Sequence, residues 1–462
     1  MSTAITTERH SIDFIPLSER YGSPRRLFTL WFSCNLSILG VAVGALSIAS
    51  GLSFAWSGLA LAVGNAIGTI FMAAHSAQGP QLGIPQMIQS RAQFGVIGAA
   101  LPLIAVVATY LLYSAADGLI IEGSVKSLVA IDDKTALVLF ALATLLIAYV
   151  GYELIHRIGA ALTVISSGLF IVAAALIVAR HPSAAAATLR LGRFNGAAFT
   201  LTMTLAAAWS LSYGPFVADY SRYLPANTLP SKTFWYTALG CFLGSTLIMA
   251  FGAYLAAADP AAVADLGSSV AALFGPVRQL AQWLIVVGVV YGNVMNLYSA
   301  YMSTCTIMSG FERMAKVGLH VKLAIMAVLM AISTSISMIA QDRFQTYFAD
   351  ILSAMIYLLV PWSAINLADY YVVRKGKYDI GAMFDTTGVY GAYRWRTISV
   401  FLLGILVQEP FMSFTFYKGA FAERIGADIA WLPGIVLSAT LYVLIERQHA
   451  RSEQRVGSGV AP

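Results

Sequence analysis

Residues 209–215, WSLSYGP, lie inside an apolar stretch, residues 197–217, that is long enough to cross a membrane as a helix. A proline inside a helix removes a backbone donor and clashes with the preceding turn, so Gly214-Pro215 predicts a break. Irregular backbone at membrane depth is tolerated only where it lines a cavity or is buried in protein. The segment therefore predicts a membrane protein in which an interrupted helix borders an internal site.

A second interrupted stretch lies near the N-terminus. Residues 27–50 are apolar, but residues 33–40 (SCNLSILG) place polar side chains and a glycine near the middle of the span. Interruptions at corresponding positions of two halves are the best sequence indication of a transporter binding site. Gly and Pro are also frequent in ordinary transmembrane helices, so each interruption alone would be a weak signal.

The composition of the whole chain agrees with a polytopic membrane protein. Of its 462 residues, 58% are hydrophobic and 11% are charged, whereas soluble domains carry about 25% charged residues. A spanning helix needs about 20 apolar residues. We therefore expect an all-α fold of about twelve transmembrane helices, at residues 27–50, 55–76, 95–121, 135–154, 157–180, 197–217, 233–257, 276–308, 319–340, 346–372, 397–416 and 427–446.

Basic residues predict the orientation of these spans. With the N-terminus inside, 19 of the 28 Lys and Arg residues fall in inner segments and 9 in outer loops, and cytoplasmic loops carry the excess of basic residues. Both termini are therefore expected in the cytoplasm, and residues 1–26 are expected to be a retained tail because no cleavage signature follows. The stretch 79–94 is too polar to span and predicts an interfacial or re-entrant segment on the inner side.

Other function classes find little support. The cysteines Cys34, Cys241 and Cys305 show no CxxC spacing, the six histidines show no metal-binding pattern, and no nucleotide-binding loop or hydrolase elbow is present. We expect no metal, no cofactor, no nucleic-acid partner and no catalytic activity. A receptor-like transporter or a membrane enzyme remains the alternative from a different class.

Few ionisable or amide groups lie within the spans. An ionisable residue there costs about 2.5–3.5 kcal/mol or more and is a functional candidate by default. Asp117 and Tyr113 are four residues apart and share a helix face; Asp117 could accept hydrogen bonds from a substrate, carry a coupling proton, or point into an outer vestibule. Asn293 and Asn296 also share a face. They could bind a heterocycle that presents donors and acceptors, or join helices.

Aromatic residues near the breaks complete the candidate site. Trp209, Tyr213 and Tyr113 could stack on a planar ring, because offset stacking contributes about 0.5–1.5 kcal/mol beyond area burial. Most of the other aromatic residues are expected in the core or at the membrane interface.

Three further segments carry a family resemblance: residues 85–95 (PQMIQSRAQFG), 218–225 (ADYSRYLP) and 368–378 (ADYYVVRKGKY). They resemble the nucleobase:cation symporter-1 family, nearest its purine-cytosine permease branch, and the likeness runs from about residue 15 to about residue 450. It implies a LeuT-like fold with alternating access: two inverted five-helix repeats and two trailing helices. The implied division is 1–26 N-terminal tail, 27–180 first repeat, 181–372 second repeat, 373–396 cytoplasmic loop, 397–446 helices 11 and 12, and 447–462 C-terminal tail.

The resemblance also implies which residues bind substrate. In related carriers the substrate ring lies between aromatic residues of helices 3 and 6, and amides of helices 1, 3 and 8 bind it. By motif, Tyr113 stands where Trp is usual and Asp117 where Gln or Asn is more frequent. The remaining candidates are Trp209 or Tyr213 in helix 6, Asn296 with Asn293 in helix 8, and Asn35 with Ser37 in helix 1, whose alternative role is hydrogen bonding between helices.

The coupling ion is predicted from a position at which this chain differs from its sodium-coupled relatives. In sodium-coupled relatives a Ser/Thr pair precedes the helix 8 asparagine by one turn, and Val290 and Tyr291 stand there in this chain. Val290 has no side-chain oxygen, which favours a proton, with Asp117 as its carrier. The expected function is a monomeric inner-membrane symporter that imports a nucleobase (cytosine or a purine) or a similar N-heterocycle. Open alternatives are allantoin, hydantoin, a pyridoxine- or thiamine-like vitamin, an amino acid, or sodium coupling.

Overall fold

The computed structural model describes residues 13–150, 152–182, 190–311, 318–341 and 344–457. Within these ranges the chain is helical, and its only β pairing is an isolated bridge between Ser413 and Lys418. The outermost residues of both predicted tails, 1–12 and 458–462, lie outside the described residues.

Every predicted span holds a helix or a pair of helices. In chain order these are α1 Arg25–Cys34 with α2 Ile38–Ala49, α3 Phe54–Ser76, α6 Ala100–Leu128, α7 Asp133–Val150, α8 Tyr152–Arg180, α10 Gly196–Leu211 with α11 Gly214–Ser221, α12 Pro230–Ala258, α14 Arg278–Phe311, α15 Leu319–Ala340, α16 Phe344–Ala368, α17 Trp395–Leu406 and α19 Trp431–Gly457. In the described part of the chain, α3, α6, α12, α14, α15 and α16 are each long and apolar enough to cross a membrane, and the bent pair α1–α2 makes a seventh such span.

Short elements connect these helices. They are η1 Leu17–Glu19, α4 Gly79–Leu82, α5 Gln86–Phe94, η2 Pro260–Ala264, α13 Leu266–Ala272, η3 Gly275–Val277, the π-turn η5 Asp369–Val373, η6 Gly381–Phe384, η7 Glu409–Phe411 and α18 Ala420–Ile425.

Both predicted breaks are present. The axes of α1 and α2 differ by 62° across the residues between Cys34 and Ile38, and the Ser37 hydroxyl accepts from the Gly40 N–H at 3.3 Å to cap α2. In the second pair, α10 ends at Leu211 and α11 begins at Gly214. Pro215 lies in the first turn of α11, where its missing N–H removes no helical hydrogen bond.

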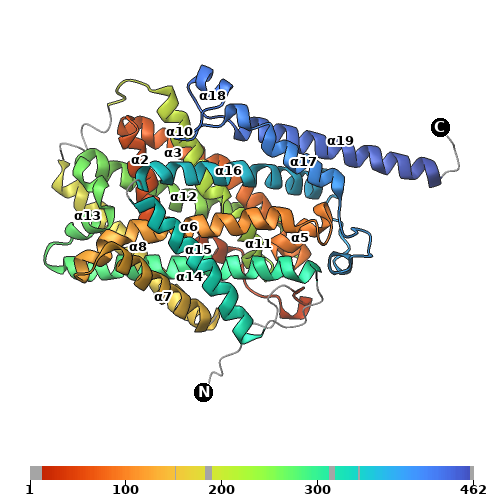
Figure 1. The fold of residues 1–462 in the computed structure, drawn as a ribbon, viewed down its shortest axis with the longest axis horizontal. Coiled ribbons are helices and arrows are strands. Elements are labelled where there is room, and N and C mark those ends of the chain that lie inside the picture. Colours follow the sequence, from red (N-terminus) through yellow and green to blue (C-terminus); the bar gives the residue numbers. More distant parts are fainter. Residues whose placement is uncertain (1–12, 151, 183–189, 312–317, 342–343, 458–462) are drawn as a thin grey trace.

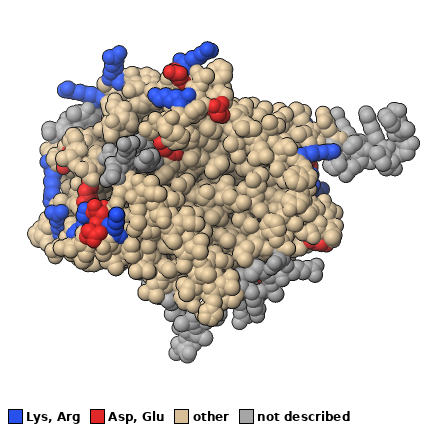
Figure 2. Space-filling model, in the orientation of Figure 1, with Lys and Arg blue, Asp and Glu red and all other residues tan. Residues whose placement is uncertain are grey.

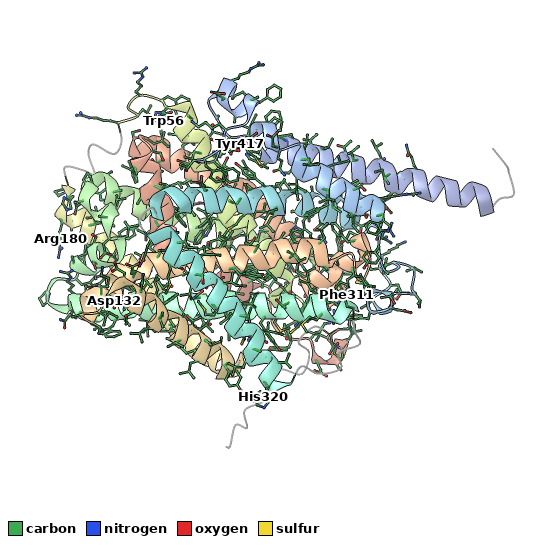
Figure 3. The ribbon with its side chains drawn as sticks, in the orientation of Figure 1. Trp56, Asp132, Arg180, Phe311, His320 and Tyr417 are labelled. Atoms are coloured by element: carbon green, nitrogen blue, oxygen red, sulfur yellow. The ribbon has the colours of Figure 1, made fainter. Side chains whose placement is uncertain are left out.

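The helix ends lie at the two opposite ends of the bundle. The helices α6, α14 and α16 run along the long axis of the molecule (Figure 1). Asp132 and Arg180 lie at one end, Phe311 lies toward the other, and His320 lies at the lower edge (Figure 3). We call the end that holds residues 13–24, α5 and η6 the N side, after the N-terminal residues. Ile15 and Arg20 donate hydrogen bonds there to the carbonyl oxygens of Gly83 and Pro80.

The charged side chains follow this arrangement. In Figure 2 they gather at the left end and along the upper edge, and the broad centre of this face is free of charge. An uncharged band between charged ends is what a bundle embedded in lipid requires.

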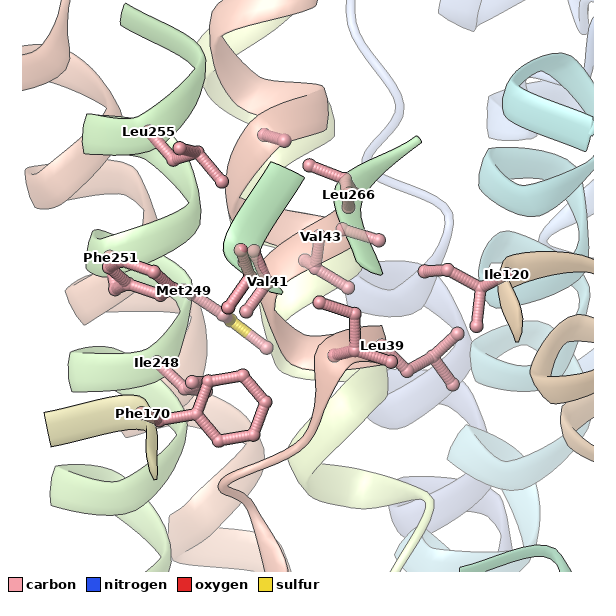
Figure 4. Packing of buried hydrophobic residues seen from close by; sticks show 14 of the residues in the cluster. Leu39, Val41, Val43, Ile120, Phe170, Ile248, Met249, Phe251, Leu255 and Leu266 are labelled. Carbon is pink, nitrogen blue, oxygen red and sulfur yellow. The ribbon is translucent and has the colours of Figure 1, made fainter. Parts of the chain in front are cut away.

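A close helix contact fixes the first break. A Cβ added to Gly44 of α2 would lie 1.8 Å from the Met249 carbonyl oxygen of α12, and one added to Gly252 would lie 2.0 Å from the Val41 carbonyl oxygen. Small residues let helix backbones approach closely in membranes. Leu39, Val41, Ile248 and Met249 then pack around this contact (Figure 4), so α2 is held firmly against α12.

Two predictions need correction. The eleventh helix was expected at 397–416, but α17 ends at Leu406 and is only 12 residues long, because Gln408 and Pro410 end it. The last helix was expected at 427–446, but α19 starts at Trp431 and continues to Gly457, through most of the predicted tail.

The polar stretch 79–94 forms α4 and α5, and at 9 residues α5 is too short to span a membrane, as predicted. Every side chain of α5 is buried in the protein, and the interfacial or re-entrant position expected for this segment stays a prediction. Arg91 is buried there, and its guanidinium donates to the Met383 and Thr306 carbonyl oxygens and to the Ser309 hydroxyl.

Candidate substrate site

A cavity of about 180 Å³ lies between the two broken helices. Its walls come from α1, the residues between α1 and α2, the start of α2, and from α6, α8, α10, α11 and α14. A water molecule needs about 10–15 Å³ of such space, so the cavity offers room for about a dozen waters, enough for a small ring compound. Six of the eight predicted site residues line it: Ser37, Tyr113, Asp117, Trp209, Tyr213 and Asn296.

A carboxylate and an amide form the polar end of the cavity. Asn296 Nδ2 of α14 donates to Asp117 Oδ2 of α6 at 3.1 Å, and the Asp117 side chain is almost completely buried. Among the described residues that line the cavity, Asp117 is the only Asp, Glu, Lys, Arg or His. The cavity therefore offers one ionisable carboxyl group, and its protonation state dominates the local electrostatics.

An aromatic corner forms a second wall. The rings of Tyr113 and Trp209 lie edge to face, with centroids 5.8 Å apart and planes at 85°, and Tyr213 stands at 87° to Trp209 with centroids 6.2 Å apart. The Tyr113 hydroxyl donates to Ser212 Oγ at 3.0 Å, and Ser212 Oγ donates to the Trp209 carbonyl oxygen at 2.7 Å. The helix break at Ser212 thus holds both rings in place.

The other two predicted residues, Asn35 and Asn293, do not line the cavity. Asn35 is fully buried behind the aromatic corner; its Oδ1 accepts from Trp209 Nε1 at 2.7 Å, and its Nδ2 donates to the Trp31 carbonyl oxygen at 2.6 Å. Asn293 is fully buried on a different face of α14 and donates to Thr144 Oγ1 of α7 at 3.2 Å. Both make the helix-to-helix hydrogen bonds that were their alternative role.

Several polar or aromatic lining residues were not predicted. A helical spacing could have found two of them: Tyr110 is seven residues before Asp117, and Ser299 is three after Asn296. The rest depend on packing between helices. The lining residues missed by the sequence analysis include Ser33, Cys34, Tyr110, Ser166, Ser212, Phe216, Tyr220, Met295 and Ser299.

The helix 8 position discussed for sodium holds no hydroxyl pair. Tyr291 lines the cavity, whereas Val290 packs against the hydrophobic core. No group of three or more His, Cys, Asp or Glu side chains that could hold a metal ion occurs within the described ranges.

The three motif segments meet on the N side in a buried cluster, which we call the Asp369 hub. The Asp369 carboxylate accepts from Gln93 Nε2 at 2.7 Å, from the Tyr378 and Tyr442 hydroxyls at 2.8 Å each, and from Arg374 Nε at 3.1 Å. The segment 218–225 is connected to the segment 85–95 through α11, where Asp219 Oδ1 accepts from the Gln86 N–H at 2.8 Å. This hub ties α5 to α11, α16 and α19.

Two discontinuous helices, a cavity between them and an all-helical bundle define a multi-pass membrane transporter. A family model described as permease for cytosine/purines, uracil, thiamine and allantoin matches residues 14–434. The chain therefore belongs to this permease family, whose members move solutes and are not enzymes.

Curated relatives agree with this membership. The chain is 40% identical over 451 residues to YxlA of Bacillus subtilis, whose name assigns it provisionally to the purine-cytosine permeases; the match covers 97% of this chain and 98% of YxlA. It is 23% identical over 470 residues to the purine-cytosine permease fcyB of Emericella nidulans, covering 96% and 89% of the two chains.

The fold also matches solved structures of Mhp1, a nucleobase-cation-symport-1 transporter. The inward-facing structure matches over 100% of both chains with a TM-score of 0.76 and 16% identity. The closed structure with bromovinylhydantoin bound matches over 96% of both chains with a TM-score of 0.74 and 15% identity. The expected helical transporter fold with broken helices 1 and 6 is thereby confirmed.

Proposed function

We propose that this protein is a secondary active transporter that imports a nucleobase, cytosine or a purine, or a similar small N-heterocycle across the plasma membrane, with both termini in the cytoplasm. The observation that carries this proposal is the cavity that the Asp117–Asn296 pair and the Tyr113–Trp209 corner line together. A planar heterocycle can stack on the aromatic wall while its edge meets hydrogen-bonding groups. The names of YxlA and fcyB support the same substrate class.

We further propose that transport is coupled to a proton and that Asp117 carries it. An isolated carboxylate in a largely apolar cavity is costly unless it is protonated or paired. Asp117 has an amide partner but no cationic partner among the described lining residues. The absence of a hydroxyl at Val290 also speaks against the sodium site of sodium-coupled relatives.

Uptake into proteoliposomes tests both proposals. Cytosine, adenine, allantoin, hydantoin, pyridoxine and an amino acid mixture are offered in turn, with either a pH gradient or a sodium gradient imposed. We expect accumulation of cytosine or adenine driven by inward-directed protons at zero sodium. Accumulation of another substrate alone would overturn the nucleobase assignment, and uptake driven by sodium at fixed pH would overturn proton coupling.

A further inference from the structure

The Asp117–Asn296 pair presents acceptor oxygens to the cavity. Because Asn296 uses Nδ2 to bond Asp117 Oδ2, its carbonyl oxygen points away from the carboxylate. Neither Asp117 Oδ1 nor Asn296 Oδ1 accepts a hydrogen bond from the described residues that surround them. Both residues line the cavity, so these oxygens are available to a ligand.

Among the described residues that line the cavity, no Lys, Arg or His side chain compensates the carboxylate. The titratable groups that line the cavity together with Asp117 include the hydroxyls of Tyr113 and Tyr213, and phenols are neutral at pH 7. The other titratable lining groups are Cys34 on α1 and Tyr110, Tyr220 and Tyr291 on α6, α11 and α14. The compensation must therefore come from the ligand or from a proton.

The two protonation states of Asp117 display different hydrogen-bonding patterns. An ionised carboxylate is acceptor-only, whereas a protonated one pairs an O–H donor with a carbonyl acceptor. The first pattern complements two adjacent N–H donors, as on the edge of guanine that carries its ring N–H and its amino group. The second complements an amidine edge, in which a ring nitrogen accepts beside an amino group that donates, as in cytosine and adenine.

We propose that a heterocycle with an amidine edge binds at Asp117 together with one proton, whereas a heterocycle with two adjacent N–H donors binds without one. The proton comes from the solvent and is shared between the carboxyl oxygen and the ring nitrogen. The neutral acid with a neutral amidine and the carboxylate with an amidinium contain the same single proton. This inference rests on the proposed function and deepens it, because the chemistry of the substrate edge then sets the proton count.

The Asp117→Asn variant separates the two patterns. An asparagine amide has one N–H₂ donor and one carbonyl acceptor, and so it mimics the protonated acid without taking up a proton. It also places a donor where the guanine edge needs an acceptor. Asp132→Asn is the matched control, because Asp132 is an exposed carboxylate in the turn before α7 that bonds only nearby Thr135 among the described residues.

The test is calorimetric titration of the purified full-length protein with cytosine or guanine at pH 7, in buffers of different ionisation enthalpy. We expect cytosine binding to take up about one proton more than guanine binding in the wild type and in Asp132→Asn, because the amidine edge needs the protonated carboxyl group and the guanine edge needs the ionised one. In Asp117→Asn, this difference in proton uptake should fall to about zero, and guanine affinity should fall at least about tenfold. Wild-type Kd values provide a second readout: that of cytosine should rise from pH 6 to pH 9, and that of guanine should not rise from pH 6 to pH 8, a range in which its ring N–H stays protonated.

The outcomes distinguish the two proposals. Equal proton uptake with cytosine and with guanine in the wild type, or an undiminished difference between them in Asp117→Asn, overturns this inference and leaves the proposed function standing. If the variant does not fold, a wild-type cytosine Kd that is independent of pH overturns the inference equally. If the wild type binds no nucleobase, both the proposed function and the inference fail.

Discussion

Trp209 Nε1 donates to Asn35 Oδ1 at 2.7 Å, so a residue at the break of the first span holds an aromatic ring that precedes the break of the sixth. Asn35 is fully buried and does not line the cavity. Its second hydrogen bond, to the Trp31 carbonyl oxygen, anchors it to α1. The two broken helices are therefore joined through the side chain that forms the aromatic wall, and Asn35 acts on a ligand by orienting that wall.

Replacing Asn35 should weaken substrate binding through Trp209. A buried donor left unsatisfied costs about 1–3 kcal/mol, so we expect Asn35→Ala to raise the substrate Kd by about tenfold. Asn35→Asp keeps the oxygen that Trp209 needs and should restore part of the affinity. In a Trp209→Phe background, Asn35→Ala should have little further effect. Equal losses in both backgrounds, measured by equilibrium binding, would show that Asn35 does not act through Trp209.

Removing either wall of the cavity should reduce affinity directly. Trp209→Ala deletes the stacking surface, worth about 0.5–1.5 kcal/mol beyond its area, and Asn296→Ala deletes the amide that donates a hydrogen bond to Asp117. We expect both variants to raise the concentration for half-maximal uptake several-fold. Wild-type affinity in both would discredit the pocket described above.

The Asp369 hub should contribute strongly to stability. Asp369 is fully buried and accepts from Gln93, Arg374, Tyr378 and Tyr442. Asp369→Asn removes the charge that pairs with Arg374, and breaking a buried ion pair costs about 3–5 kcal/mol. We expect a clear fall in the temperature of thermal unfolding in detergent. Glu423→Gln, an exposed carboxylate-to-amide change on α18, is the control and should leave that temperature unchanged.

The contact between α2 and α12 should not tolerate a larger residue. A Cβ at Gly44 would lie 1.8 Å from a backbone oxygen that cannot move independently, and overpacking typically costs about 1–3 kcal/mol. Gly44→Val should therefore lower thermal stability, whereas Gly58→Ala, where no atom lies within 4 Å of the added Cβ, should not. A Gly44→Val protein as stable as the Gly58→Ala control would contradict the close helix contact.

Hydropathy and backbone chemistry predicted most of the fold. The ninth span was expected at 319–340 and is α15 Leu319–Ala340, and the break at Gly214-Pro215 followed from the missing proline N–H. The end of α17 was misjudged because apolar residues continue after Gln408 although the helix does not. Hydropathy reports how apolar a segment is, and it does not report where the backbone turns.

The candidate site was predicted less completely, since sequence spacing places residues on a face but does not say what that face meets. Asn293 and Asn296 are three residues apart, yet one contacts α7 and the other the cavity. The rotation of each helix about its axis is set by packing partners that are distant in sequence. Asn35 is an example, because its contact with Trp209 holds it behind the cavity wall.

The Asp369 hub has a consequence for the order in which the chain matures. Gln93 lies before the third span, whereas Tyr442 lies in the last helix. During synthesis the Asp369 carboxylate must therefore wait until α19 has left the ribosome before it gains the Tyr442 hydroxyl as a donor. Assembly of the Asp369 hub thus depends on a helix that is made long after α5.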